Sequence, residues 1–491
     1  MRSVPDIRIL KSNDAPVNPK GDFVLYWMVA FRRTTWNFSL QQAVNWAVKL
    51  GKPLVILEAL RCEYPWASDR LHRFVLDGMV DNARQTSRQS VLYYPYVELK
   101  PNTGKGLLDA LAERACVIVT DDFPAFFIPK MIRAASGRLP VMIEQVDSNG
   151  ILPMRTTDRV FPTAYTFRRF LQKTLPDHLL EHPEPEPLKG VQLPKLSGLS
   201  KKIIRRWPMA TDRLLKGDSK ILASLPIDHD VPMVEERGGP SRALKILRAF
   251  VESDLSSYVE KRNQPEEEAT SGLSPYLHFG HISVHQIFHV VLEKEKWFLD
   301  RLSEKADGRR KGWWGMGEPA EAFLDQLITW RELGFNLCWQ RDDFDRYESL
   351  PAWAVETLSA HKMDKREYIY SLKEFDGGKT HDPLWNAAQI QLNREGRIHN
   401  YLRMLWGKKI LQWTATPRKA LKVMIELNNR YALDGRDPNS YSGIFWVLGR
   451  YDRAWGPDRP IFGKVRFMSS KNTARKVRVN PELAPPLSLK K

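Results

Sequence analysis

Apolar runs and amphipathic segments alternate through the first third of the chain. Runs such as FVLYWMVAF (23–31), KPLVILEAL (52–60) and CVIVTDD (116–122) lack strict alternation of apolar and polar residues. Such runs are typical of strands buried on both faces of a parallel sheet. Segments between them, among them SLQQAVNWAVKLG (39–51), repeat apolar residues at helical spacing. The pattern predicts an N-terminal α/β domain built on a doubly wound parallel sheet.

A proline-rich stretch over 175–200 separates this part from a second half with helical patterning. Beyond it, segments such as 241–262, 383–413 and 417–433 repeat apolar residues every three or four positions, which predicts an all-α domain. We expect five parts in chain order: an N-terminal extension (1–20), the α/β domain (21–165), a linker (166–205), the all-α domain (206–470) and a flexible basic tail (471–491).

The charge of the chain points to an anionic partner. Its 491 residues include 75 Lys and Arg against 58 Asp and Glu, a formal charge of +17, and nucleic acid is the first candidate for such a surplus. The three cysteines, Cys62, Cys116 and Cys338, lie too far apart for a metal site or a disulfide framework. We therefore expect no metal and a reduced, cytoplasmic location. No run of roughly 20 apolar residues predicts a membrane span.

The first βα turn lacks the glycine-rich dinucleotide fingerprint, but a later segment offers places for phosphates. In ATSGLSPYLHFGHIS (269–283), Thr270, Ser271 and Ser274 precede a predicted helix. Hydroxyls and backbone N–H groups at such a helix start can bind a pyrophosphate. The same pattern is also that of an ordinary helix N-cap. Tyr258 stands twelve residues upstream of Thr270, with Arg262 and Asn263 one helical turn later.

Tryptophan is concentrated in the second half, where eleven of the 16 tryptophans fall between Trp297 and Trp455. Trp406 and Trp413 are seven residues apart, which predicts rings on one helical face and is most often a core pattern. Gln326 and Trp330, four apart, are also predicted to share a face. Near the C-terminus, arginines interleave with tryptophans, a pattern that fits phosphate contacts beside stacking surfaces for bases.

Taken together, these segments resemble the photolyase/cryptochrome family, and within it the class II cyclobutane pyrimidine dimer photolyases of DNA. The similarity rests on ATSGLSPYLHFGHIS, THDPLWNAAQ, HNYLRMLWGKKILQW, ELNNRYALDGRDPNSYSGIFW and RYDRAWGPDRPIFGKVRFM, which occur in the family's order. It extends over nearly the whole chain. It implies the photolyase fold, an α/β domain followed by an all-α FAD-binding domain, in a protein that is monomeric, as most of the family is.

The resemblance implies an FAD in the all-α domain, which accounts for the missing fingerprint. Arg403 and Asp434 match a salt-bridged pair beside the isoalloxazine ring, and Asn428 matches the side chain that faces flavin N5. The residues that match its phosphate-binding positions are Tyr258, Thr270, Ser271, Leu273 and Ser274. The residues that match the tryptophans carrying electrons to the excited flavin are Trp385, Trp406 and Trp413, whose order in that path is left open.

The implied activity is light-driven repair, in which reduced, excited FAD lends an electron to a cyclobutane dimer flipped out of UV-damaged DNA. The predicted catalytic residues are Asn428, at the flavin, and four residues that match the dimer pocket: Gln326, Trp330, Met404 and Trp446. Trp330 and Trp446 form its aromatic walls and contact the DNA. The residues that match positions gripping the kinked backbone and filling the bubble are Arg262, Asn263, Arg453, Trp455 and Arg466.

Two positions depart from the family. Class II photolyases have a glutamate where this chain has Gln326, and a glutamine retains a donor and an acceptor but cannot ionise. The segment WMVAFRRTTWNFSL (27–40) stands where the family has a more acidic stretch. Whether the α/β domain binds a deazaflavin- or folate-type antenna chromophore is therefore left open.

Two alternatives to repair follow. One is a cryptochrome-like blue-light photoreceptor of the same fold, which Gln326 and the basic tail favour and the retained lesion-pocket residues disfavour. The other is a basic DNA-binding module without flavin, which would purify as a colourless protein.

Overall fold

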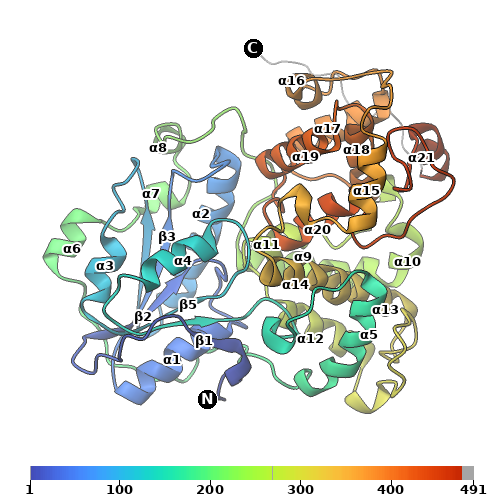
Figure 1. Cartoon of the computed structure of the whole chain (residues 1–491). Coiled ribbons are helices and arrows are strands. Elements are labelled where there is room, and N and C mark those ends of the chain that lie inside the picture. The colour runs from blue at the N-terminus through green and yellow to red at the C-terminus, as the bar shows by residue number, and fades with distance from the viewer. Residues whose placement is uncertain (1, 268, 478–491) are drawn as a thin grey trace. The chain divides into compact units, whose positions relative to one another are not determined.

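The computed structural model describes residues 2–267 and 269–477, and the chain folds into two compact units whose elements are labelled in Figure 1. The first unit comprises Met1–Asp158, Lys173–Ala249 and Gly272–Lys296, and the second comprises Arg159–Gln172, Phe250–Ser271 and Trp297–Lys491. Each unit is assembled from separate stretches of the chain. The sequence had predicted unbroken domains instead, with a linker over 166–205, whereas α5 (Ala164–Thr174) already occupies the start of that linker.

Aromatic packing accounts for one of these stretches. The segment that begins with α11 (Ser274–His278) was expected in the all-α domain, but it packs on α2 (Asp69–Thr86) of the first unit. The ring of Phe74 in α2 lies 5.2 Å from the ring of Tyr276 and 4.9 Å from that of Phe279. Rings at this spacing bury a large apolar area together, and they draw α11 into the α/β unit.

A six-stranded sheet forms the centre of the first unit, in the order β1-β6-β5-β2-β3-β4. All neighbouring strands are parallel except β1 with β6. The strands are β1 (Ile9–Lys11), β2 (Phe23–Met28), β3 (Leu54–Leu60), β4 (Val91–Val97), β5 (Ala115–Asp121) and β6 (Ile143–Val146). The chain passes from β2 outward to β3 and β4, and then returns to the other side of β2 with β5. This order confirms the predicted doubly wound sheet, with its switch point between β2 and β5.

The first crossover shows why these residues form these elements. Every residue of β2 is buried, as the unbroken apolar run predicted. The side chain of Asn37 accepts hydrogen bonds from the N–H groups of Ser39 and Leu40, which begins α1 (Phe38–Leu50). The helix ends at Gly51, whose φ of 61° is left-handed. Its apolar face packs on β2 in one core cluster.

The remaining helices of the first unit, besides α1, α2 and α11, are α3 (Leu107–Ala112), α4 (Ile128–Ser136), α6 (Lys201–Arg206), α7 (Asp212–Leu215), α8 (Ser219–Leu222), α9 (Pro240–Ala249) and α12 (Val284–Glu295). The helices of the second unit, besides α5, are α10 (Tyr258–Lys261), α13 (Glu318–Leu324), α14 (Arg331–Gln340), α15 (Ala352–Ala360), α16 (Leu372–Asp376), α17 (Pro383–Glu395), α18 (Asn400–Gln412), α19 (Pro417–Tyr431), α20 (Pro438–Val447) and α21 (Ser470–Lys476). Two π-helical segments, Phe250–Asp254 and Asp325–Trp330, interrupt the second unit. No strand lies among its described residues, as predicted for an all-α part.

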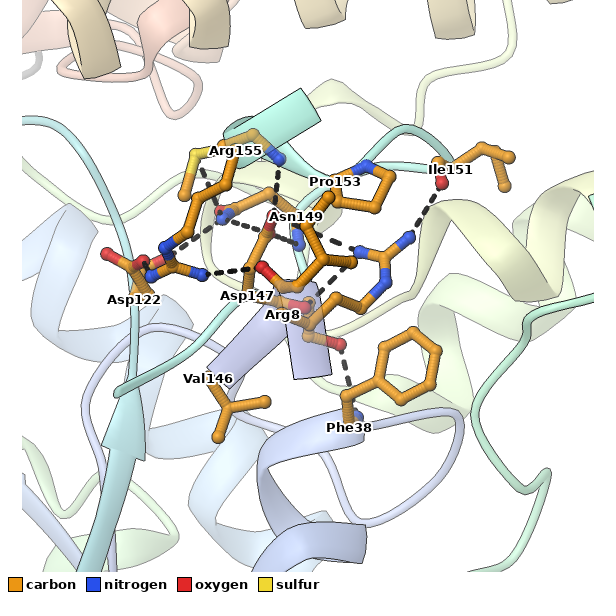
Figure 2. A network of polar contacts seen from close by, with 12 residues as sticks. Arg8, Phe38, Asp122, Val146, Asp147, Asn149, Ile151, Pro153 and Arg155 are labelled. Carbon is orange, nitrogen blue, oxygen red and sulfur yellow. Dashed lines mark hydrogen bonds and ion pairs between the residues drawn. The ribbon is translucent and has the colours of Figure 1, made fainter. Parts of the chain in front are cut away.

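The N-terminal extension is part of the sheet. Strand β1 pairs with β6, and Arg8, just before it, is fully buried. The guanidinium of Arg8 donates to the carbonyl of Ile151 at 2.6 Å and lies 3.9 Å from the Asp147 carboxylate (Figure 2). That carboxylate also accepts the backbone N–H groups of Asn149, at 3.0 Å, and Met154, at 2.7 Å. One buried cation therefore ties the extension to the loop that follows β6.

A second ion pair in the same network joins Arg155 to Asp122 at the end of β5 (Figure 2). The Asn149 side chain connects the two pairs, donating to the Asp122 carbonyl at 2.7 Å and to the Asp147 carboxylate at 2.8 Å. Burial raises the pKa of Asp122 to about 7 although Arg155 acts in the opposite direction. The carboxyl edge of the sheet is thus closed by polar groups that bind each other.

The expected basic tail begins within α21, which contains Lys471, Arg475 and Lys476. Its remainder, from Arg478 onward, lies outside the described residues. None of the helices in the described part of the chain is long and apolar enough to cross a membrane. The described residues also contain no group of three His, Cys, Asp or Glu side chains placed to hold a metal ion.

Replacing Arg8 by alanine tests the network. We expect Arg8→Ala to lower the free energy of unfolding, measured by urea denaturation, by about 3 kcal/mol, because it leaves the Asp147 carboxylate buried without its cation. Arg114→Ala is the control, since Arg114 pairs with Asp22 at the surface and such pairs contribute about 0–1 kcal/mol. Equal losses in the two variants would contradict this role for Arg8.

Candidate functional site

The predicted ion pair between Arg403 and Asp434 is present in the second unit. Arg403 lies in α18, and its two terminal nitrogens approach the two Asp434 oxygens at 3.0 and 3.4 Å. Both side chains are about one-fifth exposed. The Nε atom of Arg403 is buried and has no hydrogen-bond partner in the described chain. An unused N–H of a guanidinium at this depth is costly, and it is available to an acceptor on a ligand.

Asn428 lies in α19 and is buried. Its Nδ2 donates to Oδ1 of Asn429 at 3.1 Å and to Oγ of Ser440 at 2.9 Å. Those two bonds use both amide protons, whereas the amide oxygen accepts no hydrogen bond from a described residue. The side chain is thus held on one side and offers an acceptor on the other.

The three predicted electron-transfer tryptophans form one buried cluster, in an arrangement that their spacing did not indicate. Trp385 of α17 donates its indole N–H to the Trp406 carbonyl at 3.0 Å, and its ring lies 6.0 Å from that of Trp413, edge to face. Trp406 donates to Oε1 of Gln389 at 2.8 Å. Trp413 stands one residue past the end of α18, so helical spacing does not fix its ring position. Trp385 therefore joins the other two.

Gln326 and Trp330 lie in the π-helical segment Asp325–Trp330 between α13 and α14. Both are half-buried, and among the described residues the amide of Gln326 has no hydrogen-bond partner. Single π turns recur at functional sites because they re-aim side chains. The next helix packs tightly on α20, since a Cβ on Gly334 would lie 2.7 Å from the Pro438 carbonyl oxygen. This contact joins α14, which continues from the π-helical segment, to the start of α20, the helix that carries Trp446.

Arginines and tryptophans near the C-terminus are organised by one carboxylate that sequence reasoning missed. Asp452 accepts from Arg466 at 2.8 and 3.2 Å and from the Trp455 indole at 3.1 Å. The guanidinium of Arg466 lies 4.0 Å from the ring centre of Trp455 and 5.6 Å from that of Trp446, and Arg453 lies 4.5 Å from Trp455. Burial opposes the charge of Asp452, but these bonds lower its pKa below the ordinary value. A lone acidic residue within the RYDRAW run was the available signal.

The predicted phosphate segment runs into helix α11, and none of its three predicted hydroxyl residues occupies the N-cap position. Helix α11 begins at Ser274, and its N-cap is Leu273, with no side-chain cap hydrogen bond. Thr270 and Ser274 are exposed. Upstream, Tyr258 is buried among Phe250 and Phe323, with Arg262 5.4 Å from its ring centre.

Most of the predicted site residues fall in the second unit. The ones there form the groups just described, with Asn263 beyond the end of α10 and Met404 next to Arg403 in α18. Leu273 and Ser274 are the exceptions and belong to the first unit.

Comparison with known proteins identifies the family. The chain is 34% identical over 477 residues to the deoxyribodipyrimidine photolyase of Methanothermobacter thermautotrophicus, covering 96% of both chains. It is 33% identical over 488 residues to that of Arabidopsis thaliana, covering 96% of this chain and 91% of the relative. The chain belongs to the deoxyribodipyrimidine photolyase family. The photolyase of Potorous tridactylus is 31% identical over 474 residues, covering 95% and 82%.

Two further comparisons bear on this photolyase. Cryptochrome-2 of Arabidopsis thaliana is 30% identical over only 182 residues, 37% of this chain and 27% of the cryptochrome. A solved class III photolyase from Agrobacterium tumefaciens, 17% identical, superposes with a TM-score of 0.61 over 95% of this chain and 84% of its own, which shows the photolyase fold. No protein-family profile matches the sequence.

Proposed function

We propose that this photolyase is a class II enzyme that repairs cyclobutane pyrimidine dimers in UV-damaged DNA by light-driven electron transfer from FAD. The observation that carries the proposal is the cluster of Trp446, Trp455, Arg453 and Arg466 organised by Asp452. Half-buried indoles beside guanidinium groups suit an unstacked base and its phosphates. A light receptor of the same fold has no need of this arrangement.

The residues present fit an FAD. The unpaired Nε of Arg403 and the free amide oxygen of Asn428 are a donor and an acceptor suited to a flavin ring, with Asp434 holding the guanidinium in place. We assign the contacts to the FAD phosphates to Tyr258, Thr270, Ser271, Leu273 and Ser274. When bound and reduced, FAD supplies the electron that opens the cyclobutane ring and recovers it afterwards.

The electron path, the hydrogen bonds to the dimer and the walls of its pocket depend on how the chain's own side chains are positioned. Trp385, Trp406 and Trp413 are fixed by hydrogen bonds and ring contacts, so their separations are constant, as an electron path needs. Gln326, with its free amide, can donate to a thymine carbonyl and accept from a thymine N–H. Trp330, Met404 and Trp446 supply the apolar walls of the pocket, and Arg262 and Asn263 complete the backbone contacts.

We assign no antenna chromophore to the switch point of the sheet. There, the Asp121 carboxylate accepts the backbone N–H groups of residues 29–31 and the Tyr26 hydroxyl. Buried Arg33 donates to Ser148 and to the carbonyls of Trp36 and Gly280. A ring-sized ligand would displace these groups. A purified protein with an absorption band beyond those of flavin would contradict this assignment.

Two finer points complete the proposal. The three cysteines are all buried and unpaired, which supports a reducing, cytoplasmic location. We also propose that the enzyme acts as a monomer, the usual state in the family.

Repair of a defined lesion tests the function. We expect the purified, chemically reduced protein to restore the thymines of an oligonucleotide bearing one thymine dimer under blue light and not in darkness. Chromatography of the oligonucleotide measures the product. A yellow, photoreducible protein that leaves the dimer intact would move the function to a photoreceptor, which Gln326 favours.

Changing Gln326 tests the pocket. We expect Gln326→Glu to repair at least as fast as the parent, because a glutamic acid keeps the acceptor and, when protonated, a donor to the dimer. Gln326→Leu removes both the donor and the acceptor and should repair at least about tenfold more slowly, since about tenfold is the cost of losing one hydrogen bond. Single-turnover repair after a light flash measures both rates. A Glu variant without repair would show that this side chain does not face the dimer.

Neutralising Asp434 tests the flavin site. We expect Asp434→Asn to retain about tenfold less FAD after dialysis, because the Arg403 guanidinium loses its counter-ion and its fixed position. The ratio of flavin to protein absorbance measures this. Asp376→Asn is a matched control, since Asp376 pairs with Arg430 at 3.6 Å at similar exposure. Equal FAD loss in both variants would argue against a flavin contact at Arg403.

A further inference from the structure

A buried lysine contacts the wall residue Trp446. Lys408 lies in α18 and has no exposed surface. Its Nζ donates to the Val447 carbonyl at 2.6 Å, in the last turn of α20, and lies 4.8 Å from the ring centre of Trp446. A cation stabilises both a helix C-terminus and an indole face. The amine therefore holds the end of the helix that presents Trp446.

The charge around Trp446 is unbalanced. Lys408 and Arg466 are both within 6 Å of its ring centre. The charged groups that act on Lys408 in the described structure are Asp452 and Arg466. Of these two groups Asp452 is the negatively charged one, and its carboxylate already binds Arg466 and Trp455. With Lys408 protonated, the group carries a net charge of +1, and two of the three ammonium protons have no described acceptor.

We propose that Lys408 is a positioning residue whose protonated amine holds Trp446 and gives the surface around it the positive charge that binds a dimer-containing strand. This inference rests on the proposed function and adds a residue to it. A purely structural lysine would need only its hydrogen bond to Val447. Burying an ammonium is costly when few partners compensate it. The described hydrogen-bond acceptor of Lys408 is one carbonyl, and a charge kept at such a cost points to a function for it.

This charge titrates near neutral pH. Burial lowers the pKa of Lys408 to about 7, with Arg466 acting in the same direction and Asp452 against it. Bound DNA brings phosphates, which favour the charged amine. Above this pKa, binding must take up a proton, so the affinity falls as the pH rises, and below it the affinity is constant.

Equilibrium binding in the dark tests the proposal without any photochemistry. The measured quantity is the ratio of affinities for two oligonucleotides of one sequence, with and without a thymine dimer, since contacts to undistorted backbone cancel in the ratio. We expect the ratio to fall roughly tenfold between about pH 6 and about pH 9. In Lys408→Met, which keeps the apolar stem, the ratio should be lower at acidic pH and independent of pH.

Lys409→Met is the matched control. Lys409 is the next residue of α18 and is also buried, but its Nζ binds Gln412 and lies over Trp413 rather than Trp446. We expect this variant to keep the wild-type pH profile. A Lys408→Met profile that parallels the wild-type one would overturn the proposal.

Calorimetry on the unmodified protein covers the case in which Lys408→Met does not fold. In buffers of different ionisation enthalpy at about pH 8, binding of the dimer-containing strand should take up about one proton more than binding of the undamaged strand. Equal uptake would overturn the proposal. A wild-type protein that does not distinguish the two strands even at about pH 6 would instead refute the proposed function.

Discussion

Several cations of this basic chain are buried, and the groups that bind them fix loops and helix ends within each unit. Arg8 and Arg33 in the first unit, and Arg403 and Lys408 in the second, lie inside the fold or at its margin. Each is held by backbone carbonyls, by a carboxylate, or by both. A buried charge without such partners costs several kcal/mol. The carbonyls and carboxylates that meet this demand therefore determine where loops and helix ends can lie.

In the first unit, this demand closes the edge of the sheet where doubly wound folds bind ligands. Asp121 ends β5, and Asp122 and Asp147 directly follow β5 and β6, at the edge where a cofactor would otherwise meet them. Here they accept hydrogen bonds from the chain itself and from Arg8 and Arg155. The consequence is an edge whose carboxylates bind the chain itself rather than a ligand.

In the second unit, some buried side chains are held by hydrogen bonds to part of their atoms while one donor or acceptor stays unused. Arg403 keeps a free Nε although Asp434 holds its other nitrogens, and Asn428 keeps a free oxygen although Ser440 holds its amide nitrogen. Asp452 holds Arg466 and Trp455 in one orientation. Side chains fixed on one side and open on the other are preorganised for a ligand. The π-helical turn adds Gln326 to these groups with its amide unbound.

Local patterns in the sequence were enough to predict the parallel sheet, the all-α part and most of the candidate residues. Apolar periodicity and residue chemistry are local properties of a chain, so the run 23–31 predicted β2, and the motifs predicted Arg403, Asp434 and the tryptophans. Three features emerged with the folded chain alone. Helix α11 packs with the α/β unit, Trp385 contacts the ring of Trp413, and Asp452 and Lys408 flank the predicted wall. These depend on contacts between residues far apart in the chain, and on burial, neither of which leaves a local pattern in the sequence.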